Sequence, residues 1–123
     1  LERLKKFEGW SEQLPPGYSS VKIRGVPAHR RLRRGESIVL TPRRVVIHTL
    51  SLVKYDWPDL TVRVRCGSGV YIRALARDLG EALGTGGYLW SLCRERVGPF
   101  GIHEALACEE NTVRLYFAKE VRV

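Results

Sequence analysis

The sequence predicts a mixed α/β (α+β) fold, with an antiparallel or mixed sheet flanked by helices, from three observations. Residues 45–53 are rich in β-branched side chains, which favour strands. Residues 60–66 alternate apolar and polar side chains, the pattern of a half-buried strand, and a turn at 56–59 separates the two segments. Residues 71–84 repeat apolar side chains at helical spacing. The first two segments therefore predict an antiparallel hairpin, and a helix follows it.

Shorter elements precede the hairpin. Residues 1–14 predict a helical turn that gives way to a loop near Gly9. The sequence Pro15-Pro16-Gly17 then stops any regular element, because prolines lack an amide donor and glycine permits a left-handed turn. Three further elements are expected in order: a strand at 19–24, a turn at 25–27 and a helix at 28–34 that Gly35 closes.

The helix at 71–84 has Ser68 as its candidate N-cap and ends at Gly84. Arg77 and Glu81 stand at the i, i+4 spacing that favours an ion pair along a helix. The sequence beyond predicts three more elements: a strand or short mixed element at 88–97, a helical turn at 103–107 and a terminal strand from residue 112 onward.

Length and composition predict one water-soluble globular domain. The chain has 123 residues, of which 44% are hydrophobic and 28% charged. No apolar run approaches the ~18 residues that span a bilayer, and the first residues are charged, so we expect a cytoplasmic protein without a membrane partner. The three cysteines and three histidines are widely spaced, which predicts no disulfide framework and no metal. The absence of methionine predicts a processed or excised piece of a longer protein.

Charge points to a polyanionic partner. The chain has 21 Lys and Arg against 13 Asp and Glu, a net charge of +8. Much of the excess lies in residues 22–44, here named the basic segment, where a single acidic residue, Glu36, stands among Lys22, Arg24, Arg30, Arg31, Arg33, Arg34, Arg43 and Arg44. The planar guanidinium suits phosphate contacts and stacking on bases, which favours RNA or DNA. A solvated, charge-rich face is the alternative interpretation.

Two local features bear on chemistry. A Gly-Ser-Gly turn at 67–69 leads into the helix whose first turn presents Tyr71 and Arg73. Such turns bind phosphate through free amides and the helix dipole, although a tight turn that simply needs small residues has the same sequence. Tyr18 follows the rigid Pro-Pro-Gly sequence and serves either as core filler or as a platform on which a base stacks.

Four separated motifs agree, in order and approximate spacing, with one known family. They are Gln13–Lys22 (QLPPGYSSVK), Pro42–Val45 (PRRV), Cys66–Gly80 (CGSGVYIRALARDLG), and Leu92–Arg94 (LCR) with Val97–Phe100 (VGPF). Through them the chain resembles the bacterial tRNA pseudouridine synthase B family, from about Phe7 to about Ala107. The resemblance implies an isomerase that converts a uridine in the T-loop of tRNA to pseudouridine, without a metal or an organic cofactor.

The resemblance also implies roles for individual residues. Tyr18 matches the active-site tyrosine that stacks on the flipped base and takes part in proton removal at C5. Tyr71 and Arg73 match the tyrosine and arginine of the strand-to-helix motif, in which the arginine pairs with the catalytic aspartate. Leu92 matches an apolar residue that lines the uracil pocket, and Lys22 receives a supporting or phosphate-binding role. A base that leaves its stack needs such an aromatic and apolar replacement.

The chain departs from the family at the nucleophile. In the family the catalytic aspartate lies in a G-x-x-D type motif farther upstream of the tyrosine motif than the 17 residues before Tyr18. Asp56, Asp59 and Asp78 follow no matching motif, so we interpret them as structural or solvated. We therefore expect residues 1–108 to be the C-terminal portion of the catalytic domain, with the missing N-terminal segment in the same or another chain.

Residues 109–123 match nothing in the family and are expected to form a C-terminal tail without an assigned role. Two alternatives to the enzyme stay open at this point. One is a non-catalytic RNA-binding module that keeps the pocket wall and the basic segment. The other is a structural ribonucleoprotein subunit without a uridine pocket, which failure of Tyr18, Tyr71 and Arg73 to converge in space would favour.

Overall fold

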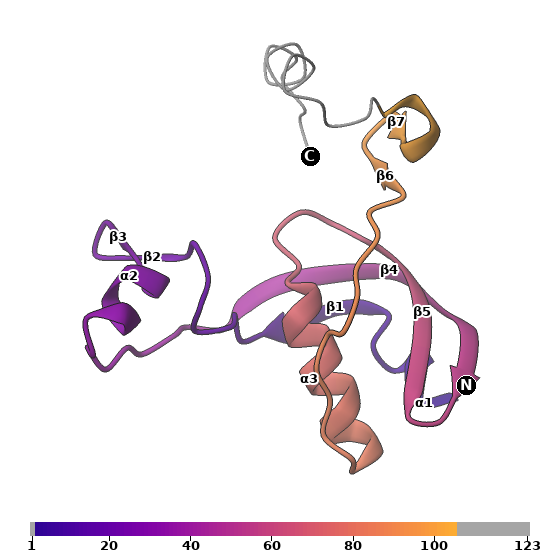
Figure 1. Ribbon diagram of the computed structural model, residues 1–123, viewed down its shortest axis with the longest axis horizontal. Helices are drawn as coiled ribbons and strands as arrows, with labels where there is room; N and C mark the ends of the chain where they lie inside the picture. Colours follow the sequence, from indigo (N-terminus) through magenta and orange to yellow (C-terminus); the bar gives the residue numbers. More distant parts are fainter. Residues whose placement is uncertain (1, 106–123) are drawn as a thin grey trace. The chain divides into compact units, whose positions relative to one another are not determined.

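The computed structural model describes residues 2–105, and the chain divides into two compact units after residue 89 (Figure 1). The first unit contains the main sheet and the three α-helices. The described part of the second unit contains a small antiparallel hairpin of β6 (Arg96–Val97) and β7 (Phe100–Gly101), which a 3₁₀ turn at Ile102–Glu104 follows. The mixed α/β fold class predicted from the sequence is confirmed.

The main sheet has three antiparallel strands in the order β1-β4-β5: β1 (Gly9–Gln13), β4 (Arg43–Asp56) and β5 (Asp59–Cys66). Figure 1 shows β4 as a long curved strand that pairs with β1 along one part and with β5 along the other. The predicted hairpin is confirmed, because β4 and β5 pair antiparallel from Asp56 opposite Asp59 onward, and β5 alternates exposed and half-buried residues along its whole length.

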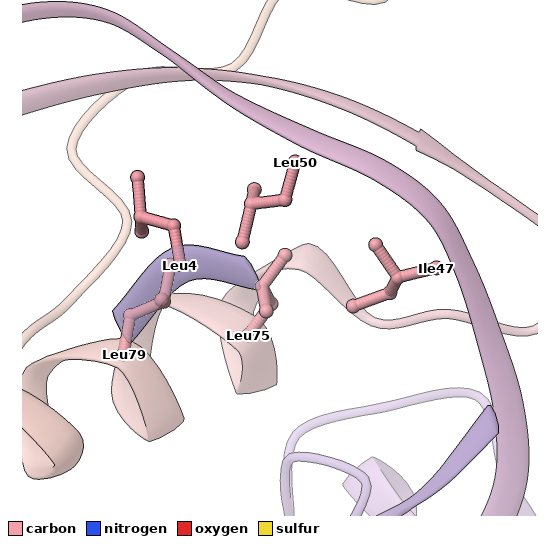
Figure 2. Packing of buried hydrophobic residues seen from close by; sticks show 5 residues of the cluster. All are labelled: Leu4, Ile47, Leu50, Leu75 and Leu79. Atoms are coloured by element: carbon pink, nitrogen blue, oxygen red, sulfur yellow. The ribbon is translucent and has the colours of Figure 1, made fainter. Parts of the chain in front are cut away.

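The hydrophobic core lies between this sheet and α3 (Ile72–Leu83), with α1 (Glu2–Lys5) at one side. Figure 2 shows the side chains of the core cluster converging from the two helices and β4: Leu4, Ile47, Leu50, Leu75 and Leu79. Full burial of each such side chain contributes about 1.5–3 kcal/mol. The core therefore fixes α3 on the sheet, and with it the residues at the start of that helix.

A smaller group of elements follows the proline-rich loop. The strands β2 (Lys22–Ile23) and β3 (Val26–Pro27) form a hairpin whose two turn residues, Arg24 and Gly25, both have positive φ, as tight hairpin turns require. α2 (Ala28–Arg33) begins directly after β3 and ends before Gly35, whose φ of +74° reverses the chain. The helix predicted at 28–34 and its glycine stop are confirmed.

Several local predictions for the first part of the chain are wrong. Gly9 starts the strand β1 rather than a loop, because this segment gains backbone partners on β4, such as Val46 opposite Trp10. Ser68 is not the N-cap of α3, since the helix begins only after Tyr71. The strand expected at 19–24 shrinks to two residues, and the turn expected at 25–27 contains the strand β3.

Three more predictions concern the later part of the chain. Arg77 pairs with its neighbour Asp78 rather than with Glu81, at 2.7 Å between Nη2 and Oδ1. The element expected at 88–97 contains a strand only at Arg96–Val97, and the helical turn expected at 103–107 is the 3₁₀ turn at 102–104. The terminal strand expected from residue 112 and the tail at 109–123 lie outside the described residues.

Candidate functional site

The loop that carries Tyr18 is held in place by a buried proline and a tight turn. Pro15 is fully buried, and the Ser19 N–H donates to the carbonyl oxygen of Gly17 at 3.0 Å in a tight turn. Gly17 approaches α2 closely, because a Cβ at this position would lie 3.0 Å from Cδ1 of Leu32. The Tyr18 side chain is 60% exposed, so the loop holds its aromatic ring at the surface rather than in the core. This result excludes core filler as the role of Tyr18.

Two arginines on one face of α3 bind this loop. Arg73 donates from Nη2 to the carbonyl oxygen of Tyr18 at 2.5 Å. Arg77, one helical turn later, donates from Nη2 to the carbonyl oxygen of Leu14 at 3.2 Å. Because the two arginines stand at i, i+4, they reach the two ends of the loop from one side of the helix.

A third connection comes from Gln13, which sequence analysis placed in a motif but gave no role. Its side chain is buried, and both ends of its amide bind the backbone of Tyr71. Oε1 accepts from the Tyr71 N–H at 2.8 Å, and Nε2 donates to the Tyr71 carbonyl oxygen at 3.1 Å. The only sequence signal for this residue was its place at the start of the Gln13–Lys22 motif.

The residues predicted for the pocket divide between the two units. Tyr18 and Arg73 are in direct contact, and Tyr71 lies half-buried immediately before α3 in the same unit. Lys22 is exposed on β2. Leu92 belongs to the second unit, where its side chain is more than half exposed. The structure thus brings Arg73, two positions after Tyr71, into contact with the backbone of Tyr18.

The basic segment is mostly exposed, with two members that have partners within the chain. Arg31 is half-buried and pairs with Glu36 at 2.8 Å, and Arg44 lies over the ring of Trp10, 4.9 Å from its centroid. The other members are exposed: Lys22, Arg24, Arg30, Arg33, Arg34 and Arg43. Among residues 2–105, these six, rather than all eight, form the positive surface of β2, α2 and the start of β4 that lacks an ion pair or a ring contact.

The aspartates of the described residues have structural settings. Asp78 lines a hollow of about 320 Å³ beside Gln13 and Leu75, where Arg77 holds its carboxylate through both Nε and Nη2. Asp56 pairs with Lys54 near the tip of the β4–β5 hairpin, and Asp59 is exposed at the start of β5. These settings agree with the interpretation of all three as structural or solvated.

Within residues 2–105 there is no group of three or more His, Cys, Asp or Glu side chains arranged to hold a metal ion. None of the helices described has the length and apolar character needed to cross a membrane.

Comparison with known proteins identifies the family. Residues 1–72 match the model of the TruB family pseudouridylate synthase (N terminal domain), which covers more than half of the chain. The chain belongs to this family. The elements that the match covers run from α1 through β5 to the first residue of α3. It therefore includes Gln13, Tyr18 and Tyr71, and ends one residue before Arg73.

Bacterial members of the TruB family are similar over a longer range. The tRNA pseudouridine synthase B of Francisella philomiragia is 45% identical over 103 residues, which cover 84% of this chain and 34% of that protein. The proteins of the same name from Bradyrhizobium diazoefficiens and Thermobifida fusca are 45% and 44% identical over 113 and 114 residues. Those matches cover 89% and 86% of this chain but 32% and 39% of the relatives. The chain thus spans about a third of the length of these relatives.

Proposed function

We propose that the chain forms part of the catalytic domain of an isomerase that converts uridine to pseudouridine in the T-loop of tRNA. The observation that supports the proposal is the contact of Arg73 with the carbonyl oxygen of Tyr18, in a member of the TruB family. The relatives' name, tRNA pseudouridine synthase B, supports tRNA as the substrate. The reaction needs no metal or organic cofactor, and a cytoplasmic location follows from the substrate.

Arg73 is proposed to hold the nucleophile. Its guanidinium has five N–H donors, and the Tyr18 carbonyl oxygen engages Nη2, so further donors of the fork can pair with a carboxylate. That carboxylate belongs to a catalytic aspartate supplied from outside these 123 residues. A cation beside an aspartate favours its ionised form, which is the form that attacks.

The remaining pocket residues are proposed to receive the flipped base. The exposed Tyr18 ring supplies a surface on which the extruded uracil stacks, in place of the neighbours that it leaves in the RNA. Through the family resemblance, Tyr71 and Leu92 are each assigned a contact with the uracil, and Lys22 a contact with the RNA close to the tyrosine. The domain is proposed to comprise residues 1–108, with residues 109–123 as a tail.

The exposed members of the basic segment are proposed to bind the RNA backbone. Guanidinium groups on α2 and the β2–β3 hairpin can neutralise phosphates along one strand, which gives affinity without sequence preference. Arg43 and Arg44 extend this surface onto β4, where Arg44 also packs on the exposed ring of Trp10. Arg31 is the weakest member, because Glu36 already neutralises it.

A chimera tests the proposed function. In it, this chain replaces the 103 residues that it matches in the Francisella philomiragia relative. We expect the chimera to release tritium from tRNA labelled at C5 of uridine, because forming the new bond at C5 expels that hydrogen, whereas the 123-residue chain alone binds the RNA without release. Release by the chain alone would show that its own residues include the nucleophile. A chimera that binds tRNA but never turns over would favour a non-catalytic RNA-binding module.

A further inference from the structure

Gln13 is a buried polar side chain that the proposed chemistry does not use. Only 4% of its surface is exposed, although it stands at the end of a strand whose other residues are all exposed. A buried amide must have both its donor and its acceptor satisfied, or folding is penalised. Here the backbone of one residue, Tyr71, satisfies both ends, and that residue lies 58 positions along the chain.

We propose that Gln13 is a positioning residue, which fixes Tyr71 and the start of α3 and thereby sets the place of Arg73 against the Tyr18 loop. This inference rests on the proposed function for its catalytic consequence. Its structural part stands on the hydrogen bonds alone.

The geometry of the amide supports this role. Two hydrogen bonds to the N–H and the carbonyl of the same residue fix its position and also its rotation, as a pair of bonds in a β-ladder does. The Tyr71 carbonyl also accepts the first hydrogen bond of α3, from the Leu75 N–H at 3.0 Å. Gln13 therefore forms hydrogen bonds with the residue that precedes the helix, two positions before Arg73.

The contacts of Arg73 and Arg77 with the loop depend on the two hydrogen bonds of Gln13. Arg77 and Arg73 bind the carbonyl oxygens of Leu14 and Tyr18, but both of these hydrogen bonds are exposed to water. Exposed polar contacts contribute little on their own, whereas the Gln13 pair is partly buried and has the stronger effect on geometry. Gln13 is thus the anchor from which the loop and the helix keep their spacing.

Two variants and one control test the inference. Gln13→Leu keeps the burial and removes both hydrogen bonds. Gln13→Glu keeps the acceptor, but its carboxylate cannot donate to the Tyr71 carbonyl until it is protonated. Glu12→Gln, the adjacent exposed residue on β1, is the control for a change of strand residue that breaks neither bond.

The first measurement is amide hydrogen exchange at Tyr71 in the 123-residue chain. We expect Gln13→Leu to accelerate exchange about 10- to 100-fold, the loss that one or two hydrogen bonds correspond to, and Glu12→Gln to leave it unchanged. Exchange at Tyr71 that is equally slow in Gln13→Leu overturns the inference. This arm needs no enzymatic activity, so it decides the structural part even if the chimera never turns over and the proposed function fails.

The second measurement separates positioning from binding in the chimera. We expect Gln13→Leu to lower the single-turnover rate about 10-fold or more while the Kd for tRNA stays within about twofold, because Gln13 is buried, with its amide bound to Tyr71, and acts through Arg73. An unchanged rate, or a rate that falls only as far as tRNA binding weakens, overturns the positioning role.

The third measurement covers the case in which Gln13→Leu fails to fold. For Gln13→Glu we expect the deficit in rate to shrink as the pH falls, because the protonated carboxyl both donates and accepts as glutamine does. Other charged groups border the same hollow, namely Lys6, Glu12 and Asp78 with its partner Arg77. Because these groups also affect the rate at different pH, the rate of the variant at each pH is divided by that of the unsubstituted chimera. A ratio that does not change with pH overturns the inference.

Discussion

Gln13 and Tyr71 are joined by two hydrogen bonds, of 2.8 and 3.1 Å, between one side-chain amide and one residue's backbone. They connect the last residue of β1 to the residue before α3, so the loop that leaves the strand and the helix that follows the hairpin share an anchor. Arg73 extends this connection to the carbonyl of Tyr18. The proposed site is therefore assembled by contacts between segments that are far apart in the sequence.

Arg73→Lys separates the proposed catalytic role of this residue from a structural one. A cation in the first turn of a helix opposes the helix dipole, and the Tyr18 carbonyl oxygen offsets part of this cost. Lysine keeps the charge and one donor but loses the planar fork that binds a carboxylate. We expect the single-turnover rate of the chimera to fall about 10- to 100-fold, the value of a hydrogen bond to a charged group.

The stability of the 123-residue chain provides the comparison. Because the Arg73 contact is exposed, Arg73→Lys should change the free energy of unfolding by less than about 0.5 kcal/mol, measured by urea denaturation. Arg77→Lys is the matched control one turn along α3, where the fork binds Asp78 and the Leu14 carbonyl oxygen rather than the nucleophile. Near-normal turnover by Arg73→Lys, or an equal loss in Arg77→Lys, would remove Arg73 from the proposed active site.

Replacing Arg30, Arg33 and Arg34 together by glutamine tests the proposed RNA-binding surface. All three are exposed on or beside α2, so their loss should weaken tRNA binding and flatten its dependence on salt. Each phosphate contact contributes about 0.7–0.9 to the slope of log K against log salt, so the slope should fall by up to about 2–3. Filter binding at several salt concentrations measures it.

Arg31→Gln is the control within the same helix. Its charge is already paired with Glu36, so its loss should leave the slope nearly unchanged. A salt slope that the triple substitution does not alter would mean that α2 faces away from the RNA.

The sequence predicted those parts of the fold whose signals are local. Alternation along β5 and apolar spacing along α3 are properties of neighbouring residues, so the hairpin and the helix were found. β1 gave no such signal, because four of its five residues are exposed and its strand conformation comes from pairing with β4. A strand that forms because it pairs with a distant segment shows no alternation of apolar and polar residues in its own sequence.

In the candidate site, too, local sequence signals could be predicted and tertiary contacts could not. Tyr18, Tyr71 and Arg73 were named through motif resemblance, but the contact between Arg73 and Tyr18 depends on tertiary structure. The role of Gln13 was missed because a glutamine carries no sign of burial when its partner lies 58 residues away. Arg31 could not be separated from its neighbours, since Glu36 reaches it only after the reversal at Gly35.

Leu75→Ala should destabilise the chain strongly, because Leu75 lies at the centre of the core cluster with 2% of its surface exposed. Removing a buried leucine side chain leaves a cavity and costs about 2–5 kcal/mol. Leu83→Ala on the same helix is the control, since Leu83 is 44% exposed, and it should cost less than about 1 kcal/mol. Equal losses in urea denaturation would contradict the placement of α3 on the sheet.

Gly80→Ala tests whether the backbone of residues 86 and 87 packs against α3. The sign of the change in the free energy of unfolding decides this question. In an open helix, alanine in place of glycine stabilises by about 0.5–1 kcal/mol. At Gly80, however, the added Cβ would lie 2.2 Å from backbone atoms of Gly86 and Gly87, which cannot move aside as a flexible side chain does. We therefore expect a net loss of about 1–3 kcal/mol, as overpacking causes.

Gly84→Ala separates this contact from backbone strain in the same segment. Gly84 caps α3 with a φ of +77°, but a Cβ there would meet no atom within 4 Å, so alanine should cost only the left-handed conformation, about 1 kcal/mol. The Gly80→Ala variant should also accelerate amide exchange at Thr85 and Gly86, whose N–H groups donate to the Gly80 carbonyl at 3.0 and 3.1 Å. Stabilisation by Gly80→Ala would show that residues 86 and 87 do not pack on the helix in solution.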